Sequence, residues 1–206
     1  IAVQMVAGIS YFSFAGIMMG WFGSFSIAAH AMAMNVASFT YLIASGIGSG
    51  ATIRISNFLG ANKFHKLEVA AHSASLMTLG FALMCSALIY FLRFEIPLLF
   101  LPSLENETIT LAAKLLAICA IFEIFDHTQI TTLGILRGLQ DVKFASVMCL
   151  ASYWLVGFAV SYLCGVTFGF GALGIWCGFV ASLFLTSTIF VLRYFRALRH
   201  CKKLVN

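Results

Sequence analysis

The sequence predicts an all-α membrane protein that crosses the bilayer six times. Hydrophobic residues make up 62% of its 206 residues and charged residues only 9%, whereas a soluble domain carries about 25% charged residues. The mean hydropathy is +1.02. Because a helix needs about 20 apolar residues to cross the hydrocarbon core, a chain of this length with short connections accommodates roughly six spans.

The apolar runs and the polar joints between them place the individual spans. We expect spans at residues 1–21, 28–53, 69–92, 109–136, 144–166 and 172–192, with a basic tail over 193–206. The first span opens on Ile1 inside an apolar run, without an initiator Met or a charged flank. We therefore expect a fragment whose missing part lies upstream.

The distribution of charge predicts the topology and argues against a nucleic-acid partner. The net charge is +5, but the basic residues lie at helix ends and in the tail, not in a stripe with interleaved aromatic residues. The connection 54–66 is basic, the connection 93–108 holds three glutamates against one arginine, and the tail is strongly basic. By the positive-inside rule, this multi-pass chain has both ends in the cytoplasm, and we expect it in the inner membrane.

No motif in the sequence indicates catalysis or a bound cofactor. The six cysteines contain no C-x-x-C pair, and five of them lie in apolar runs, where cysteine behaves as a small hydrophobic residue. The metalloprotease pattern H-E-x-x-H and the nucleophile elbow G-x-S-x-G are both missing from the sequence. We expect neither an enzyme nor a cofactor.

The fourth span carries two acids and is the predicted functional element. Glu123 and Asp126 are three residues apart, so they lie about 60° apart on one face of a helix. A charge near the bilayer centre costs roughly 2.5–3.5 kcal/mol or more, so such acids indicate an ion or proton site. Asp126 lies eleven residues before Arg137, roughly 16 Å from the cytoplasmic end and near the midplane.

Neighbouring polar and aromatic residues complete the predicted site. Gln129, one turn from Asp126, and Asn35 would supply the neutral oxygen ligands that a hard cation prefers, although Asn35 also suits a hydrogen bond between helices. Phe122 and Phe125 would offer their faces to an organic cation, but with 21 phenylalanines in the chain simple packing is the commoner role.

Two groups of motifs resemble the multidrug and toxic compound extrusion (MATE) family. The first lies in the second span of the chain and the second in the turn after the fourth span. The segments are Ala28-Ala29-His30, Asn35 to Ser38, Gly46 to Ala51 and Arg54 to Ala61, which includes Gly60, and then the L-R-G-x-x-D segment formed by Leu136, Arg137, Gly138 and Asp141.

The resemblance implies a fold and an activity. Members of this family have two six-helix lobes, so the chain would be the C-terminal lobe of a twelve-helix transporter and its partner the missing N-terminal lobe. The family exports organic cations and drugs in exchange for Na⁺ or H⁺. Asp126 matches an aspartate eleven residues before the L-R-G arginine that serves the cation site, and would be the Na⁺ ligand. The glutamate that this branch usually carries in the first helix is replaced by Gly8, and we hypothesise that Glu123 substitutes for it.

The leading prediction is a cation-coupled exporter in which Asp126 binds Na⁺ or releases H⁺, with Glu123 and Asp126 titrating as a coupled pair if they approach each other. A flippase for a lipid-linked precursor from the same superfamily is an alternative, but it would need a cationic cleft, and the predicted interior holds acids. An inactive half-transporter fragment is a further alternative.

Overall fold

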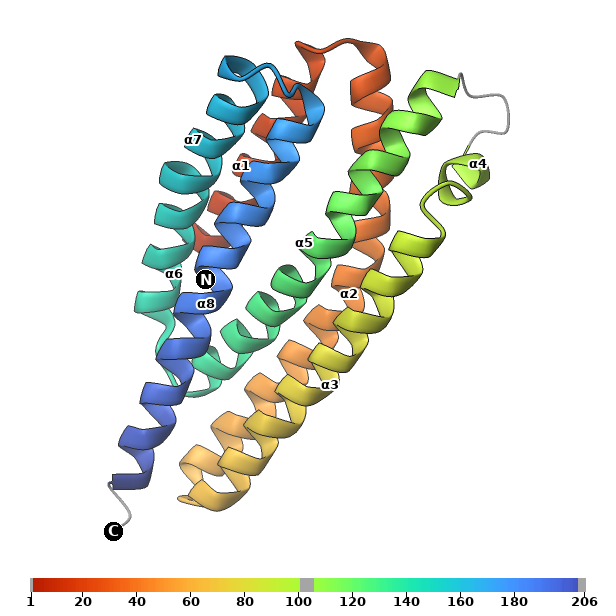
Figure 1. Ribbon diagram of the computed structural model, residues 1–206. Coiled ribbons are helices and arrows are strands. Elements are labelled where there is room, and N and C mark those ends of the chain that lie inside the picture. The colour runs from red at the N-terminus through yellow and green to blue at the C-terminus, as the bar shows by residue number, and fades with distance from the viewer. Residues whose placement is uncertain (1, 101–105, 204–206) are drawn as a thin grey trace.

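All regular structure is helical in residues 2–100 and 106–203, which are the residues that the computed structural model describes (Figure 1). The long helices are α1 (Ala2–Gly20), α2 (Ser24–Gly60), α3 (Phe64–Phe91), α5 (Asn106–Gly138) and α8 (Ala172–Lys203), with the short α4 (Ile96–Phe100) between α3 and α5. Of the acidic residues expected between the third and fourth spans, Glu105 lies outside the described residues.

The fifth span is one continuous rod of alternating helix types. It consists of α6 (Val142–Ala151), the π-helix η1 (Ser152–Gly157), α7 (Phe158–Tyr162) and the π-helix η2 (Leu163–Thr167). Both π segments close with bonds to the fifth preceding carbonyl, from Phe158 N–H to Tyr153 O and from Phe168 N–H to Leu163 O. Nothing in the sequence pattern indicated these wide turns.

The predicted all-α membrane class is confirmed. Within the described residues, five helices are long and apolar enough to cross a membrane, and the shorter apolar helix Gln4–Gly20 accompanies them. Their surfaces carry exposed large apolar side chains, such as Phe39 at 70% and Leu155 at 72% exposure. Such a surface would be a liability in water, whereas lipid tails accept it.

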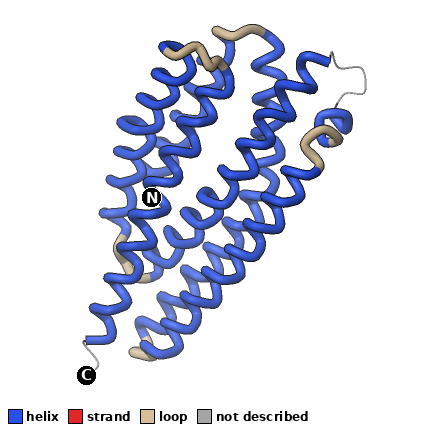
Figure 2. The backbone as a smooth tube through the Cα atoms, in the orientation of Figure 1, coloured by secondary structure: helices blue, strands red, loops and turns tan. Residues whose placement is uncertain are grey.

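Most of the long helices extend beyond the spans that hydropathy predicts, although α1 lies within its predicted span. The basic connection expected over 54–66 is largely helical, because α2 continues to Gly60 and α3 begins at Phe64. The connections that the structure describes are short turns, which Figure 2 shows as the tan segments between long blue rods. Hydropathy detects only the part of a helix that lies in hydrocarbon, so polar extensions escape it.

Helices α2 and α5 are each followed by a residue in the left-handed backbone conformation. Asn62 has φ 54° and Gln140 has φ 67°. After each, an N–H reaches back to a carbonyl five residues earlier, from Lys63 to Phe58 at 2.9 Å and from Asp141 to Leu136 at 2.9 Å. This is the Schellman arrangement, in which the last carbonyls of the helix are satisfied.

Helix α5 is the central element of the bundle. It packs against α2, α3 and α8, and in Figure 1 it runs in green between the α2–α3 pair and the group of α1, α7 and α8. The approach of α2 is close at Gly134, because a Cβ there would overlap the carbonyl of Gly48. Thr52 Oγ1 also donates a hydrogen bond to Gly134 O at 2.8 Å.

The fifth span and α8 are similarly close. A Cβ on Gly174 would overlap the backbone of Cys164, and one on Gly178 would overlap the hydroxyl of Ser161. Small residues allow membrane helices to gain van der Waals contact in this way. The bundle therefore holds α5 and its polar side chains between helices packed backbone to backbone.

Candidate functional site

Glu123 is completely enclosed within the lobe formed by these helices. Its side chain has no exposed surface, and Thr40 Oγ1 of α2 lies 2.6 Å from its Oε2 as hydrogen-bond donor. The same hydroxyl lies 2.9 Å from Ala37 O, so its single proton has two competing acceptors. The Cys119 thiol, one turn earlier on α5, lies 3.8 Å from Oε1.

His127 is the second buried partner of Glu123. Its Nε2 lies 2.8 Å from Glu123 Oε2, and neither side chain is exposed. The N–H direction does not satisfy a hydrogen bond, and Nδ1 is also buried without a partner in the described chain, so the contact is chiefly electrostatic. The ring stacks on Phe81 of α3 at a centroid distance of 5.3 Å and an interplanar angle of 27°.

Asp126 differs from Glu123 in having no such partners. It is buried, with 8% of its surface exposed, and no hydrogen bond or ion pair to its carboxylate forms within residues 2–100 and 106–203. Glu123 lies within electrostatic reach on the same helix. The two acids that the sequence placed on one face thus have different surroundings. Glu123 is enclosed by partner side chains, whereas Asp126 has no partner among the described residues.

Gln129 lies beside the fifth span, on the side of α5 away from His127. Its Nε2 donates to the Tyr153 hydroxyl at 2.6 Å and lies 3.5 Å from the Cys149 sulfur. The same sulfur accepts from Gln4 Nε2 at 3.2 Å, and Arg137 Nη2 donates to Gln4 Oε1 at 3.2 Å. Because the amide nitrogen of Gln129 is used in these contacts, its carbonyl oxygen is the atom left available to a ligand.

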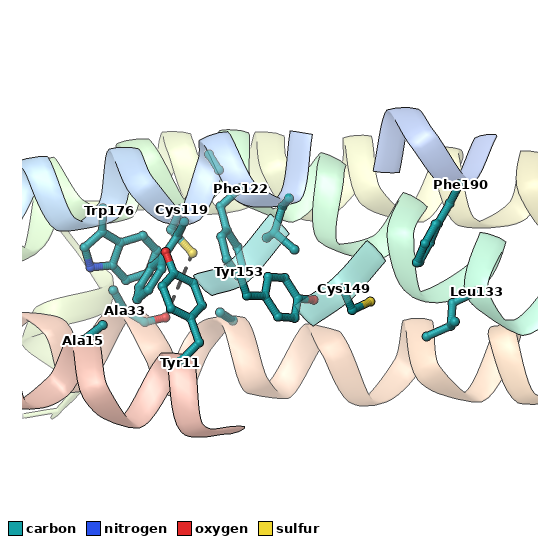
Figure 3. Packing of buried hydrophobic residues seen from close by; sticks show 14 of the residues in the cluster. Tyr11, Ala15, Ala33, Cys119, Phe122, Leu133, Cys149, Tyr153, Trp176 and Phe190 are labelled. Atoms are coloured by element: carbon teal, nitrogen blue, oxygen red, sulfur yellow. Dashed lines mark hydrogen bonds between the residues drawn. The ribbon is translucent and has the colours of Figure 1, made fainter. Parts of the chain in front are cut away.

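Phe122 and Phe125 face α8. Phe122 is 3% exposed and packs edge-to-face on Trp176 at 5.7 Å and on Phe12 at 6.3 Å. Figure 3 shows Phe122 in this cluster with Tyr11, Tyr153 and Trp176. Phe125 is half-buried and meets Phe184 edge-on at 5.2 Å. Their role as faces for an organic cation stays a prediction, and within this chain Phe122 is covered by other aromatic rings.

The predicted ligand Asn35, and Gly8, where the usual glutamate is missing, both lie apart from Glu123. Asn35 is exposed and lies about 140° around α2 from Thr40, so the structure does not bring it to Glu123. A Cβ at Gly8 would meet the ring of Tyr153 at 3.6 Å. The position where the family usually carries a glutamate therefore faces the side chain that binds Gln129.

The motif residues have structural partners. The Trp176 indole N–H donates to His30 Nδ1 at 3.2 Å, and both residues are buried. A Cβ on Gly138 would come within 2.8 Å of Ile55 Cβ on α2, which explains the small residue after Arg137. Gly60 ends α2 without a positive φ, since Asn62 adopts that conformation.

The arrangement offers no preassembled metal centre of several strong ligands. Among the described residues, no three His, Cys, Asp or Glu side chains gather in a group able to hold a metal ion. A weakly held cation at Asp126 would depend on neutral oxygens, and the predicted one is Gln129 Oε1, about one turn further along α5. The role of His127 was missed at the sequence level, although its spacing of four residues from Glu123 is the signal that places two side chains together on a helix.

Comparison with known proteins gives a consistent assignment. The MatE family model matches residues 1–163. The chain is 30% identical over 202 residues to the probable multidrug resistance protein NorM of Rhizobium meliloti, and 30% identical over 203 residues to the multidrug resistance protein PmpM of Pseudomonas aeruginosa. These alignments cover 97% of this chain but only 43% and 42% of the two relatives.

Solved structures show the same fold. The crystal structure of the eukaryotic MATE transporter AtDTX14 superposes with a TM-score of 0.83 at 21% identity, covering 95% of this chain and 45% of that one. A transporter of the MOP superfamily from Pyrococcus furiosus superposes with a TM-score of 0.81 at 20% identity, covering 91% and 41%. The chain thus spans less than half the length of the proteins that it matches.

Proposed function

Because the chain belongs to the MatE family, we propose that it supplies one six-helix lobe of a secondary active transporter that exports organic cations in exchange for Na⁺ or H⁺. The names of the relatives, multidrug resistance proteins, support drug export. The coverage of less than half of each relative supports a second lobe as the partner. We place the protein in the inner membrane with both ends of this lobe in the cytoplasm, in accordance with the positive-inside rule.

The observation that carries the proposal is the unpaired Asp126 carboxylate. A buried ionised carboxylate is costly unless a cation or a proton compensates it, and among the residues that the structure describes Asp126 forms no ion pair. It therefore has a strong tendency to take up a cation when one can reach it. Glu123, in contact with His127 and Thr40, lacks this tendency.

Exchange follows from the alternation of access. When Asp126 faces the outside, Na⁺ or H⁺ neutralises it; when it faces the cytoplasm, the ion leaves and the carboxylate again favours a positive guest. Gln129 would contribute its carbonyl oxygen to a bound Na⁺, whereas a proton would need only the carboxylate. An organic cation and the coupling ion thus compete for one negative charge, which is the physical requirement for antiport.

The test is cation-driven dye efflux in cells that produce the full-length protein with Asp126→Asn or Asp126→Glu. We expect Asp126→Asn to abolish coupled efflux, and Asp126→Glu, which keeps the charge, to retain part of it. Undiminished efflux by Asp126→Asn would refute the proposal. Binding of a lipid-linked pyrophosphate in place of dye cations would favour the flippase instead.

A further inference from the structure

We propose that Glu123 has its partner inside the lobe, and that the Glu123–His127 pair is a sealed structural clasp between α2, α3 and α5 that takes no part in ion exchange. The consequence rests on the proposed function: Asp126 is then the single acid through which this lobe couples, and the lobe takes one coupling cation per cycle.

The first argument is enclosure. Both side chains have no exposed surface within this chain alone, so neither the second lobe nor the lipid is needed to cover them. A coupling site has to be reached from each side of the membrane in turn, whereas this pair is sealed by its own helices. Asp126 keeps 8% of its surface open.

The second argument is charge. Removing an isolated carboxylate from water is prohibitive, and a paired one is tolerated when its partner is close. His127 Nε2 at 2.8 Å is such a partner. The other two ion pairs of the described residues are partly exposed. The acid thus has a basic ring as its neighbour inside the lobe and does not depend on an exchangeable cation for a partner.

The third argument is position. The clasp joins three helices, because Glu123 meets Thr40 of α2 at 2.6 Å and His127 stacks on Phe81 of α3 at 5.3 Å. The side chains that contact the pair include Thr40, Phe81 and Cys119. The Asp126 carboxyl on α5 and the Cys85 thiol on α3 lie within electrostatic reach of Glu123. Glu123 and His127 are therefore positioning residues for the helix that carries Asp126.

The test is a double-mutant cycle in the full-length protein with Glu123→Gln, His127→Gln and the combination, measured as the midpoint of thermal unfolding in detergent. His127→Gln leaves a buried carboxylate without its cation and should lower Tm by roughly 5 °C or more. Glu123→Gln removes the buried carboxylate itself, leaves no acid in the enclosed site, and should cost less. The double variant should recover most of the loss, because no charge remains unpaired. Glu107→Gln, at an exposed position in the first turn of α5, is the control and should lower Tm far less, since a first-turn acid contributes only about 0.3–1 kcal/mol.

The transport readout separates the clasp from the cation site. The double variant should keep the number of Na⁺ or H⁺ exchanged per organic cation, measured as a flux ratio in proteoliposomes. Additive losses of Tm in the cycle would overturn the clasp, and so would a double variant that folds but exchanges one cation fewer. If the parent protein shows no coupled efflux, the proposed function fails, while the unfolding cycle still decides whether the clasp exists.

Discussion

Arg193 Nε donates to Asp141 Oδ2 at 2.6 Å, which connects the turn after α5 to the C-terminal half of α8, 52 residues later. The guanidinium also lies over the ring of Phe144, 4.7 Å from its centroid. The last residue of the L-R-G-x-x-D segment therefore has a structural partner. It fixes the end of the helix that carries the candidate cation site.

Arg193→Gln should remove the ion pair with Asp141 but leave the fold intact. The two side chains are 42% and 22% exposed, so solvent screens the pair, and we expect a loss of about 1 kcal/mol or less. Thermal unfolding of the full-length protein at low and high salt measures it, and the loss should shrink with added salt. Arg196→Gln, an exposed arginine on the same helix, is the control. An equal loss in the two variants would contradict a specific ion pair.

Gly134→Ala should separate α2 from α5. The added Cβ would overlap the carbonyl of Gly48, a backbone atom that cannot rotate away, and we expect a cost of roughly 1–3 kcal/mol from forced backbone shifts. Gly46→Ala is the control, because a Cβ there meets no atom within 4 Å and alanine favours the helix by about 0.5–1 kcal/mol. Midpoints of thermal unfolding compare the two, and equal stability would speak against the close contact.

His30→Phe should leave the Trp176 indole N–H without its acceptor. The pair is buried, and an unsatisfied buried donor costs about 1–3 kcal/mol. Trp176→Phe removes the donor instead, and the double variant should lose less than the sum of the two single changes. Circular dichroism during thermal unfolding monitors the series without relying on tryptophan fluorescence. Strict additivity would mean that the hydrogen bond contributes nothing.

The helical fold could be predicted because, in a bilayer, the apolar runs of a sequence determine where its helices form. Long apolar runs bounded by charged joints must form helices there, since every backbone group has to be satisfied within its own segment. The left-handed turn at Asn62 also follows a recognisable pattern, in which glycine or asparagine ends a helix. The ends of α2 and α3 were harder to predict, because their polar turns continue the helix beyond the apolar run.

The site was only partly predictable. The carboxylates stand out in an apolar helix, so Glu123 and Asp126 could be identified, and Asp126 proved to be unpaired. Their different surroundings depend on side chains from other helices, such as Thr40 and Tyr153, and no spacing along one helix determines those contacts. The π-helical turn that carries Tyr153 lies in an ordinary apolar run, so the sequence held no sign of it.

Direct binding of the coupling cation to purified full-length protein tests the central claim that Asp126 is the exchanged charge of this lobe. Isothermal titration with Na⁺, and proton release recorded with a pH indicator when an organic cation is added, together cover both coupling ions. We predict that Asp126→Asn removes the cation signal assigned to this lobe, while Glu123→Gln combined with His127→Gln leaves it unchanged. An intact signal in folded Asp126→Asn protein would contradict the account.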